Sequence, residues 1–195
     1  MDLYKGNQEP LYKVCLVGDG GVGKSTILER FLQTEERFQV GYKPTIGMAI
    51  AVKRITIENS VINFQIWDIA GQPHFEFVRV SFYKGSRAII MVFDFTSPQT
   101  LHHLQKWINE IMSNINYVIP FLVVGNKADL QSTIDPNEIK DFIENLKHKT
   151  PLKSLPFLST SALTGYNINE VFETLGRTIL KFYNVQNFPY LQVTL

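Results

Sequence analysis

Eight residues, Gly18–Ser25, combine four glycines with a lysine and a hydroxyl side chain in the pattern G-x-x-x-x-G-K-[ST]. They follow the apolar run Val14–Val17 and precede an amphipathic segment, so they are expected to join a strand to a helix. Glycines let successive backbone N–H groups point inward around an anion, and the start of the helix adds partial positive charge. The motif predicts a loop that binds the phosphates of a nucleoside triphosphate, and we call Gly18–Ser25 the phosphate loop.

Two side chains of the phosphate loop have distinct expected roles. Lys24 would bridge the outer phosphates, and the Ser25 hydroxyl would bind Mg²⁺, which prefers oxygen ligands. The residues assigned to nucleotide binding in this region are Gly20, Gly21, Val22, Gly23, Lys24, Ser25 and Thr26. A glycine-rich turn without a ligand is the alternative, and the motif alone does not distinguish hydrolysis from motor work or phosphoryl transfer.

Residues 126–129, Asn-Lys-Ala-Asp, predict which base is recognised. They follow the buried run Phe121–Val124, at the expected carboxyl end of a strand, where open α/β sheets bind ligands. The Asp129 carboxylate can accept hydrogen bonds from N1–H and the 2-amino group of guanine, whereas adenine offers neither donor. A polar turn without a ligand is the alternative here. The residues assigned to guanine binding are Asn126, Lys127 and Asp129.

A second segment, Thr160–Leu163, is expected to lie beside the base. It follows the apolar triplet at 156–158, at the end of the last expected strand. Its backbone N–H groups could reach the guanine carbonyl oxygen, while the Ser161 hydroxyl supports Asp129. The residues assigned to this contact are Ser161, Ala162 and Leu163.

Two further segments could sense the terminal phosphate. Asp68, at the end of an expected strand, can hold a water of the Mg²⁺ shell, and Gly71 lets a backbone N–H approach the phosphate. Gln72 can orient the attacking water. Upstream, Thr45 offers a second hydroxyl for Mg²⁺ on a loop that would be ordered by the terminal phosphate. An exposed turn and a solvated threonine are the alternatives.

The elements that must position these residues are those of an α/β fold, because short apolar runs alternate with amphipathic stretches. Strands are expected at 12–17, 49–57, 61–67, 88–93, 121–125 and 156–160, helices at 24–32, 98–115, 136–149 and 167–183, and loops at 32–46 and 71–84. Asn59 and Ser60 are expected in the turn of a hairpin, which predicts an antiparallel strand at one sheet edge. Ser97 and Asp135 precede prolines and are expected to cap helices.

Composition narrows the class of protein. The chain has 195 residues, the size of one domain, and a formal net charge of +1, which predicts no nucleic-acid partner. Cys15 is the single cysteine, which excludes an internal disulfide and fits a reducing compartment. The apolar runs are far shorter than the roughly 18 residues of a membrane span, and no apolar leader opens the chain. A cytoplasmic location is therefore expected.

Taken together, the five motifs resemble the Ras superfamily of small GTPases, most closely its Rab branch. GDGGVGKS, PTIG, WDIAGQ, NKAD and TSAL occur in the family's order with similar separations. The resemblance implies a P-loop NTPase G domain with a six-stranded, mostly parallel sheet, one antiparallel edge strand and helices on both faces. It implies an N-terminal extension at residues 1–11, the G domain at 12–184 and a C-terminal tail at 185–195.

The resemblance assigns further residues. Phe38 would contact guanine and Tyr42 would lie over the phosphates, while Gly20 would tolerate no larger side chain near Gln72. An apolar patch that faces effectors is expected at Trp67, Phe75 and Tyr83. An exchange factor, a GTPase-activating protein and effectors would bind the loops around Thr45 and Gln72.

Several features depart from the Rab pattern. The interval from Ser25 to Thr45 is longer, Pro73-His74 replaces the usual Glu-Arg, and residues 48–50 differ, so partner recognition is expected to differ. The final residues, 187–195, contain no cysteine, which is the residue that carries the prenyl group of Rab proteins. No intrinsic lipid anchor is expected in this chain, and peripheral membrane contact would come through a partner or a tail beyond this sequence.

The predicted function is a nucleotide-dependent switch in vesicle trafficking or signalling that hydrolyses GTP to GDP, with Gln72 and Lys24 as its catalytic residues. Because no arginine neighbours Thr45, turnover is expected to be slow, on the order of 10⁻⁴ to 10⁻² s⁻¹ without a partner. One alternative is a GTP-binding interaction module with little hydrolysis, since Pro73 stiffens the loop beside Gln72. A phosphotransferase would need an arginine-rich lid, which the sequence lacks.

Overall fold

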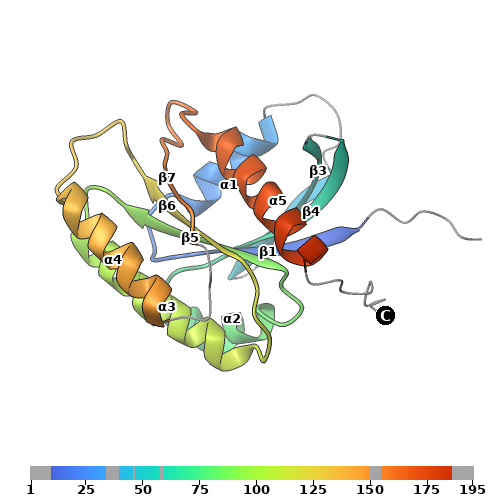
Figure 1. Ribbon diagram of the computed structural model, residues 1–195, viewed down its shortest axis with the longest axis horizontal. Helices are drawn as coiled ribbons and strands as arrows, with labels where there is room; N and C mark the ends of the chain where they lie inside the picture. The colour runs from blue at the N-terminus through green and yellow to red at the C-terminus, as the bar shows by residue number, and fades with distance from the viewer. Residues whose placement is uncertain (1–9, 34–39, 46, 58, 150–154, 186–195) are drawn as a thin grey trace, which may run out of the picture.

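A seven-stranded mixed sheet forms the centre of the computed structural model, which describes residues 10–33, 40–45, 47–57, 59–149 and 155–185 (Figure 1). The strands are β1 (Leu11–Val17), β2 (Val40–Thr45), β3 (Met48–Ile57), β4 (Ser60–Ile69), β5 (Ala88–Asp94), β6 (Phe121–Asn126) and β7 (Phe157–Ser159). Their order across the sheet is β2-β3-β4-β1-β5-β6-β7. The pairs from β4 to β7 are parallel, and those that β3 makes with β2 and β4 are antiparallel.

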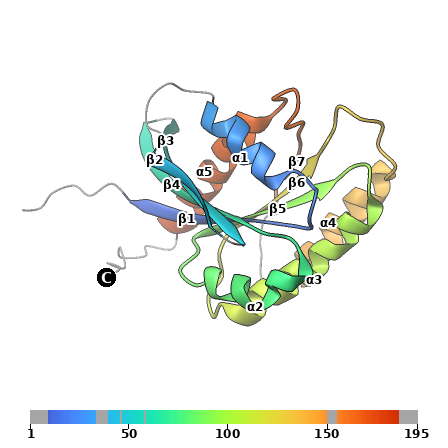
Figure 2. The same cartoon turned by 180° about the vertical axis from the view of Figure 1, so that it is seen from behind.

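Helices cover both faces of the sheet. They are α1 (Lys24–Gln33), α2 (Glu76–Arg79), α3 (Pro98–Asn114), α4 (Pro136–Lys149) and α5 (Ile168–Val185), with 3-10 turns at Pro73–Phe75 and Val80–Phe82. α1 and α5 lie over one face, and α2, α3 and α4 lie over the other (Figures 1 and 2). None of the helices in the described ranges is both long and apolar enough to cross a bilayer.

Two apolar cores join the helices to the sheet. On the α1 and α5 face, Phe31 stacks on Phe172 with ring centroids 3.6 Å apart. On the opposite face, Trp107 and Ile108 of α3 belong to the cluster that includes Phe93 of β5. Every residue of β5 and β6 is buried, as expected for central strands covered on both sides. This packing fixes the carboxyl ends of β1 and β6, from which the phosphate loop and the 126–129 segment leave.

The predicted α/β architecture is confirmed. All six expected strands and all four expected helices are present, with boundaries shifted by a few residues at most. The β3–β4 hairpin is present too, but Ile57 pairs with Ser60, so Ser60 begins β4 rather than sitting in the turn. Asp135 caps α4 as expected, since its Oδ1 accepts a hydrogen bond from Asn137 N–H at 2.7 Å.

Three local predictions are wrong. Residues 40–45, expected in a loop, form β2, because the open edge of β3 supplies backbone partners that local sequence does not reveal. The expected loop at 71–84 contains α2 and two 3-10 turns, which are too short to show a helical period. Ser97 makes no side-chain cap; its carbonyl instead accepts from the Thr100 hydroxyl at 2.7 Å.

Candidate nucleotide-binding site

The phosphate loop leaves β1 at the middle of the sheet and enters α1 at Lys24, as the motif predicts. The Lys24 ammonium is buried and donates to the carbonyl oxygens of Gly18 and Asp19, both at 2.8 Å. Burial lowers the pKa of Lys24 to about 8, although the nearby carboxylates of Asp68 and Asp19 oppose this shift. A buried cation at this position favours an anionic ligand, which would replace the solvation that burial removes.

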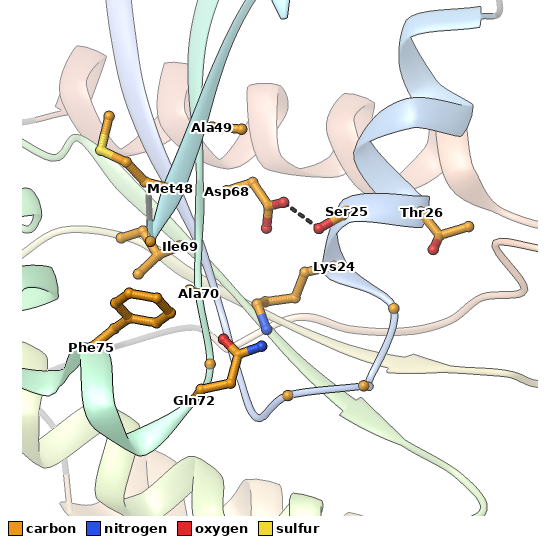
Figure 3. Close-up of a pocket in the computed structure, with 15 residues that line it drawn as sticks. Lys24, Ser25, Thr26, Met48, Ala49, Asp68, Ile69, Ala70, Gln72 and Phe75 are labelled. Carbon is orange, nitrogen blue, oxygen red and sulfur yellow. Dashed lines mark hydrogen bonds between the residues drawn. The ribbon is translucent and has the colours of Figure 1, made fainter. Parts of the chain in front are cut away.

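Ser25 and Asp68 meet beside this lysine. The Ser25 hydroxyl donates a hydrogen bond to Asp68 Oδ2, from the end of β4 (Figure 3). Burial raises the pKa of Asp68, while the bond from Ser25 and the charge of Lys24 act in the opposite direction. A hydroxyl and a carboxylate in contact provide the oxygen ligands that Mg²⁺ prefers. The structure thus brings two of the three predicted metal residues together.

A pocket of about 470 Å³ opens over these side chains. Its lining residues are Gly20, Gly21, Gly23, Lys24, Ser25, Thr26, Gly47, Met48, Ala49, Asp68, Ile69, Ala70, Gly71, Gln72 and Phe75. Gln72 is exposed, and its side chain extends toward Lys24 (Figure 3). A Cβ at Gly71 would lie 2.3 Å from the Gly18 carbonyl oxygen, so only glycine lets this loop approach the phosphate loop so closely. Gly71 and Gln72 therefore line the pocket on the side where Gly71 approaches the phosphate loop.

Asn126 joins the phosphate loop to the predicted base segments. Its Nδ2 donates to Val22 O at 2.9 Å, and its Oδ1 accepts from Ala162 N–H at 3.0 Å and the Thr160 hydroxyl at 3.2 Å. A Cβ at Gly23 would lie 2.3 Å from Asn126 Nδ2, and Gly23 has φ +95°, so no other residue fits there. One buried amide thus links three of the motifs.

The base segments surround Asn126 but lie outside the 470 Å³ pocket. Lys127 Nζ is 2.5 Å from Asp94 Oδ2. Burial acts to raise the pKa of Asp94, but the hydrogen bonds from Lys127 and Thr96 hold it below its usual range. Asp129 is exposed at the next turn, so its carboxylate is accessible to a base.

The Thr160–Leu163 segment differs in detail from the expectation. The Ser161 hydroxyl accepts from Thr164 N–H at 3.1 Å within its own loop, whereas the sequence predicted that it would support Asp129. Ser161 N–H donates to Tyr166 O at 3.1 Å, and Ala162 N–H donates to Asn126. Both N–H groups are therefore engaged within the protein, whereas the sequence analysis expected backbone N–H groups of this segment to reach the guanine carbonyl oxygen.

For three predicted residues, Tyr42, Thr45 and Phe38, the structure gives the backbone position at most. Tyr42 and Thr45 lie in β2, where the backbone of Thr45 pairs with Met48. The next described residue, Gly47, accepts a hydrogen bond from Ala70 N–H at 2.9 Å, which brings this turn to the end of β4. Phe38 lies outside the described residues.

The predicted apolar patch is wrong at Tyr83. That side chain is fully buried, and its hydroxyl donates to Glu110 Oε1 at 2.6 Å. Trp67 instead contacts Phe82, with ring centroids 5.8 Å apart, and the Lys13 ammonium lies 3.7 Å from the indole. Phe82 ends a 3-10 turn and Tyr83 directly follows it, and the sequence alone does not resolve which of two such neighbouring aromatic side chains is buried.

Asp19, an unassigned position of the motif, has two partners that sequence reasoning missed. Trp107 Nε1 donates to its Oδ1 at 2.9 Å, and His103 Nδ1 is 2.6 Å from its Oδ2. His103 and Trp107 are four residues apart and share one face of α3. The spacing of four residues predicts that the two side chains share a helix face, but the sequence around them does not indicate that this face contacts the phosphate loop.

This geometry defines a class of protein. A phosphate loop with a buried lysine, joined through Asn126 to a second loop at the same sheet edge, is the arrangement of a P-loop nucleotide-binding protein. Comparison with known proteins shows which family of P-loop proteins the chain belongs to.

A model of the Ras family matches residues 13–181. Ras-related protein Rab-11A of Dictyostelium discoideum is 35% identical over 190 residues, which cover 95% of this chain and 83% of that protein. GTP-binding protein YPT53 of Saccharomyces cerevisiae is 37% identical over 86% of this chain and 76% of its own length, and Ras-related protein RABA4b of Arabidopsis thaliana is 34% identical over 93% and 78%. The chain belongs to the Ras family.

Within that family the chain is Rab-like, as the motifs predict. It is a small GTPase that hydrolyses GTP to GDP and acts as a nucleotide-dependent switch. Like other members it has regulators and effectors as partners. The interaction module with little hydrolysis gains no support from these comparisons.

Replacing Asn126 with alanine tests the link between the loops. The substitution leaves Val22 O and Ala162 N–H without their buried partner, so affinity for GDP should fall about 10- to 100-fold, or ~1–3 kcal/mol. Isothermal titration calorimetry measures this change. Asn109→Ala, on the exposed face of α3, is the matched control and should bind like the unmodified chain. Equal affinities for the two variants would contradict the role of Asn126.

Proposed function

We propose that the phosphate loop and Lys24 hold the outer phosphates of GTP. The observation that carries this proposal is the buried Lys24 ammonium at the pocket, because a phosphate would stabilise its charge. Gly20 to Thr26 supply the surrounding backbone at the start of α1. A Cβ at Gly20 would make an ordinary contact with Gln72 Cγ at 3.8 Å, so the two residues are neighbours and a side chain longer than that of alanine is proposed to disturb Gln72.

The residues at the pocket also fit Mg²⁺. Ser25 and Thr45 are the proposed direct ligands, and Asp68 would hold a water of the metal's shell. The support for this assignment is the contact between the Ser25 hydroxyl and the Asp68 carboxylate, both oxygen donors beside Lys24. When bound, the metal ion would neutralise charge that develops on the phosphates.

Gln72 and Lys24 are the proposed catalytic residues. Gln72 would orient a water for attack on the terminal phosphorus, and Lys24 would stabilise the negative charge as GDP leaves. The close approach of Gly71 to the phosphate loop supports this assignment, because it carries Gln72 to the pocket.

Guanine selection is assigned to the loops around Asn126. Asp129 would accept hydrogen bonds from the base, Lys127 would flank it, and Ser161 to Leu163 would line its other side. The exposure of the Asp129 carboxylate, next to a loop fixed by Asn126, supports this proposal. By the family resemblance, Phe38 would contact the base and Tyr42 the phosphates.

Partners are proposed to bind the surface around Thr45 and Gln72. In α2, Phe77 is 94% exposed and Val78 is 48% exposed, which offers apolar surface beside the loop that a terminal phosphate would order. An exchange factor, a GTPase-activating protein and effectors would use this region. The Rab-like sequence supports a role in vesicle trafficking for a cytoplasmic chain that is peripheral at membranes.

A Gln72→Leu substitution tests the hydrolytic assignment. Leucine cannot orient water, so the single-turnover rate of GTP hydrolysis should fall about 10-fold or more while GTP affinity changes little. Quenched-flow assays and nucleotide titration measure the two quantities. Gln33→Leu, at the exposed end of α1, serves as the control. An unchanged hydrolysis rate for Gln72→Leu would remove Gln72 from the mechanism.

An Asp129→Asn substitution tests base selection. The amide can donate to the 2-carbonyl of xanthine but can no longer accept both guanine donors, so the preference for GDP over xanthosine diphosphate should shift about 100-fold or more. Competition binding with the two diphosphates measures the ratio. Asp141→Asn, exposed on α4, should leave it unchanged. Retention of the guanine preference by Asp129→Asn would contradict the assignment.

A further inference from the structure

A buried arginine connects α2 to α3. The Arg79 side chain is 8% exposed, and its Nε and Nη2 donate to the two carboxylate oxygens of Glu110 at 2.7 and 2.5 Å. Its guanidinium also lies over the Trp107 ring, 4.3 Å from the ring centroid. We call Arg79, Glu110 and Trp107 the α2–α3 latch. A planar guanidinium held on two oxygens and one ring face has little freedom to move.

Arg79 is the residue that fixes α2 to the protein. Of the four residues of this helix, Glu76, Phe77 and Val78 are exposed and Arg79 alone is buried. A single helical turn has almost no stability of its own, so its position depends on tertiary contacts. The hydrogen bonds of Arg79 therefore decide where α2, and the loop that leads into it, lies.

The latch reaches the loop proposed to carry out hydrolysis. Arg79 Nη1 is 3.5 Å from the carbonyl oxygen of Gln72, which also accepts Phe75 N–H at 3.1 Å. Arg79 is also close enough to the phosphate pocket for its charge to add to the effect of burial in lowering the pKa of Lys24. The guanidinium thus contacts the backbone at Gln72 without lining the pocket itself.

The latch reaches the phosphate loop as well. Trp107 contacts Arg79 with its ring face, and its Nε1 donates to Asp19 Oδ1 at 2.9 Å. His103, one turn earlier, lies 2.6 Å from the other oxygen of Asp19. The Trp107 indole therefore contacts both Arg79, which holds the Gln72 loop, and Asp19 of the phosphate loop.

We propose that Arg79 is a positioning residue for GTP hydrolysis, which holds the backbone at Gln72 in register with the phosphate loop through Glu110 and Trp107. The inference rests on the proposed role of Gln72. Reacting groups must be aligned closely, and a misplacement of about 1 Å can slow a reaction about 100-fold. Loss of the latch should therefore slow hydrolysis without weakening nucleotide binding, since Arg79 does not line the phosphate pocket.

Arg79→Ala and Glu110→Gln provide the test on the full chain. Both should reduce the single-turnover rate of GTP hydrolysis about 10-fold and change the dissociation constant for GDP by less than about twofold. Glu110→Gln keeps an acceptor for the Tyr83 hydroxyl and carries the test if Arg79→Ala does not fold. Arg177→Ala, which removes an exposed arginine that pairs with Glu170 and Glu173 on α5, is the matched control and should hydrolyse GTP normally.

A double-mutant cycle shows whether Arg79 acts through Gln72. In the Gln72→Leu background, Arg79→Ala should cause no further loss of rate, because the group that it positions is absent. An equal loss in both backgrounds, or a lowered melting temperature with unchanged hydrolysis, would overturn the inference. Slow hydrolysis by Gln72→Leu with a normal rate for both latch variants would overturn it while leaving the proposed function intact. A normal rate for Gln72→Leu would overturn both.

Discussion

The buried amide of Asn126 is the contact on which the arrangement of the site depends. It binds the phosphate loop at Val22 and the Thr160–Leu163 loop at Ala162, so two segments separated by more than a hundred residues hold a fixed distance. Gly23 packs against this amide so closely that a Cβ there would lie 2.3 Å from Asn126 Nδ2. Because an unpaired buried amide is costly, the two loops and the end of β6 are expected to form together. The nucleotide would then bind a largely preformed cradle.

The Gly71–Gln72 side of the pocket is held by fewer buried contacts than the Asn126 side. On that side, Gly71 lies against the phosphate loop, but the short helix that follows, α2, exposes Glu76, Phe77 and Val78 and buries Arg79 alone. This segment draws little stability from the core, which is typical of elements that change conformation. Under the proposed function, the site would combine a cradle for the base and phosphates, held by Asn126, with a wall at Gln72 that responds to the terminal phosphate. The α2–α3 latch would set the resting position of that wall.

Sequence alone predicted the parts of this structure that local patterns encode. The apolar runs of β5 and β6 and the glycine spacing of the phosphate loop were sufficient to place Lys24, Ser25 and Asn126 at one edge of an α/β sheet. It did not predict β2, whose partner is the edge of another strand, or the burial of Tyr83. The contacts of Asp19 with α3 and of Arg79 with Glu110 were also missed. Each depends on side chains brought together by tertiary packing, and no local period reports such pairs.

If the proposed function holds, this chain forms a single cradle that selects guanine nucleotides. The most direct measurement is the nucleotide carried by the purified protein, extracted by denaturation and analysed for base identity and phosphate number. We expect GDP or GTP at roughly one equivalent per chain, which stays bound in magnesium buffer and is released when the metal is chelated. Adenine nucleotides in the extract, or no nucleotide together with no calorimetric binding of added GDP, would contradict it.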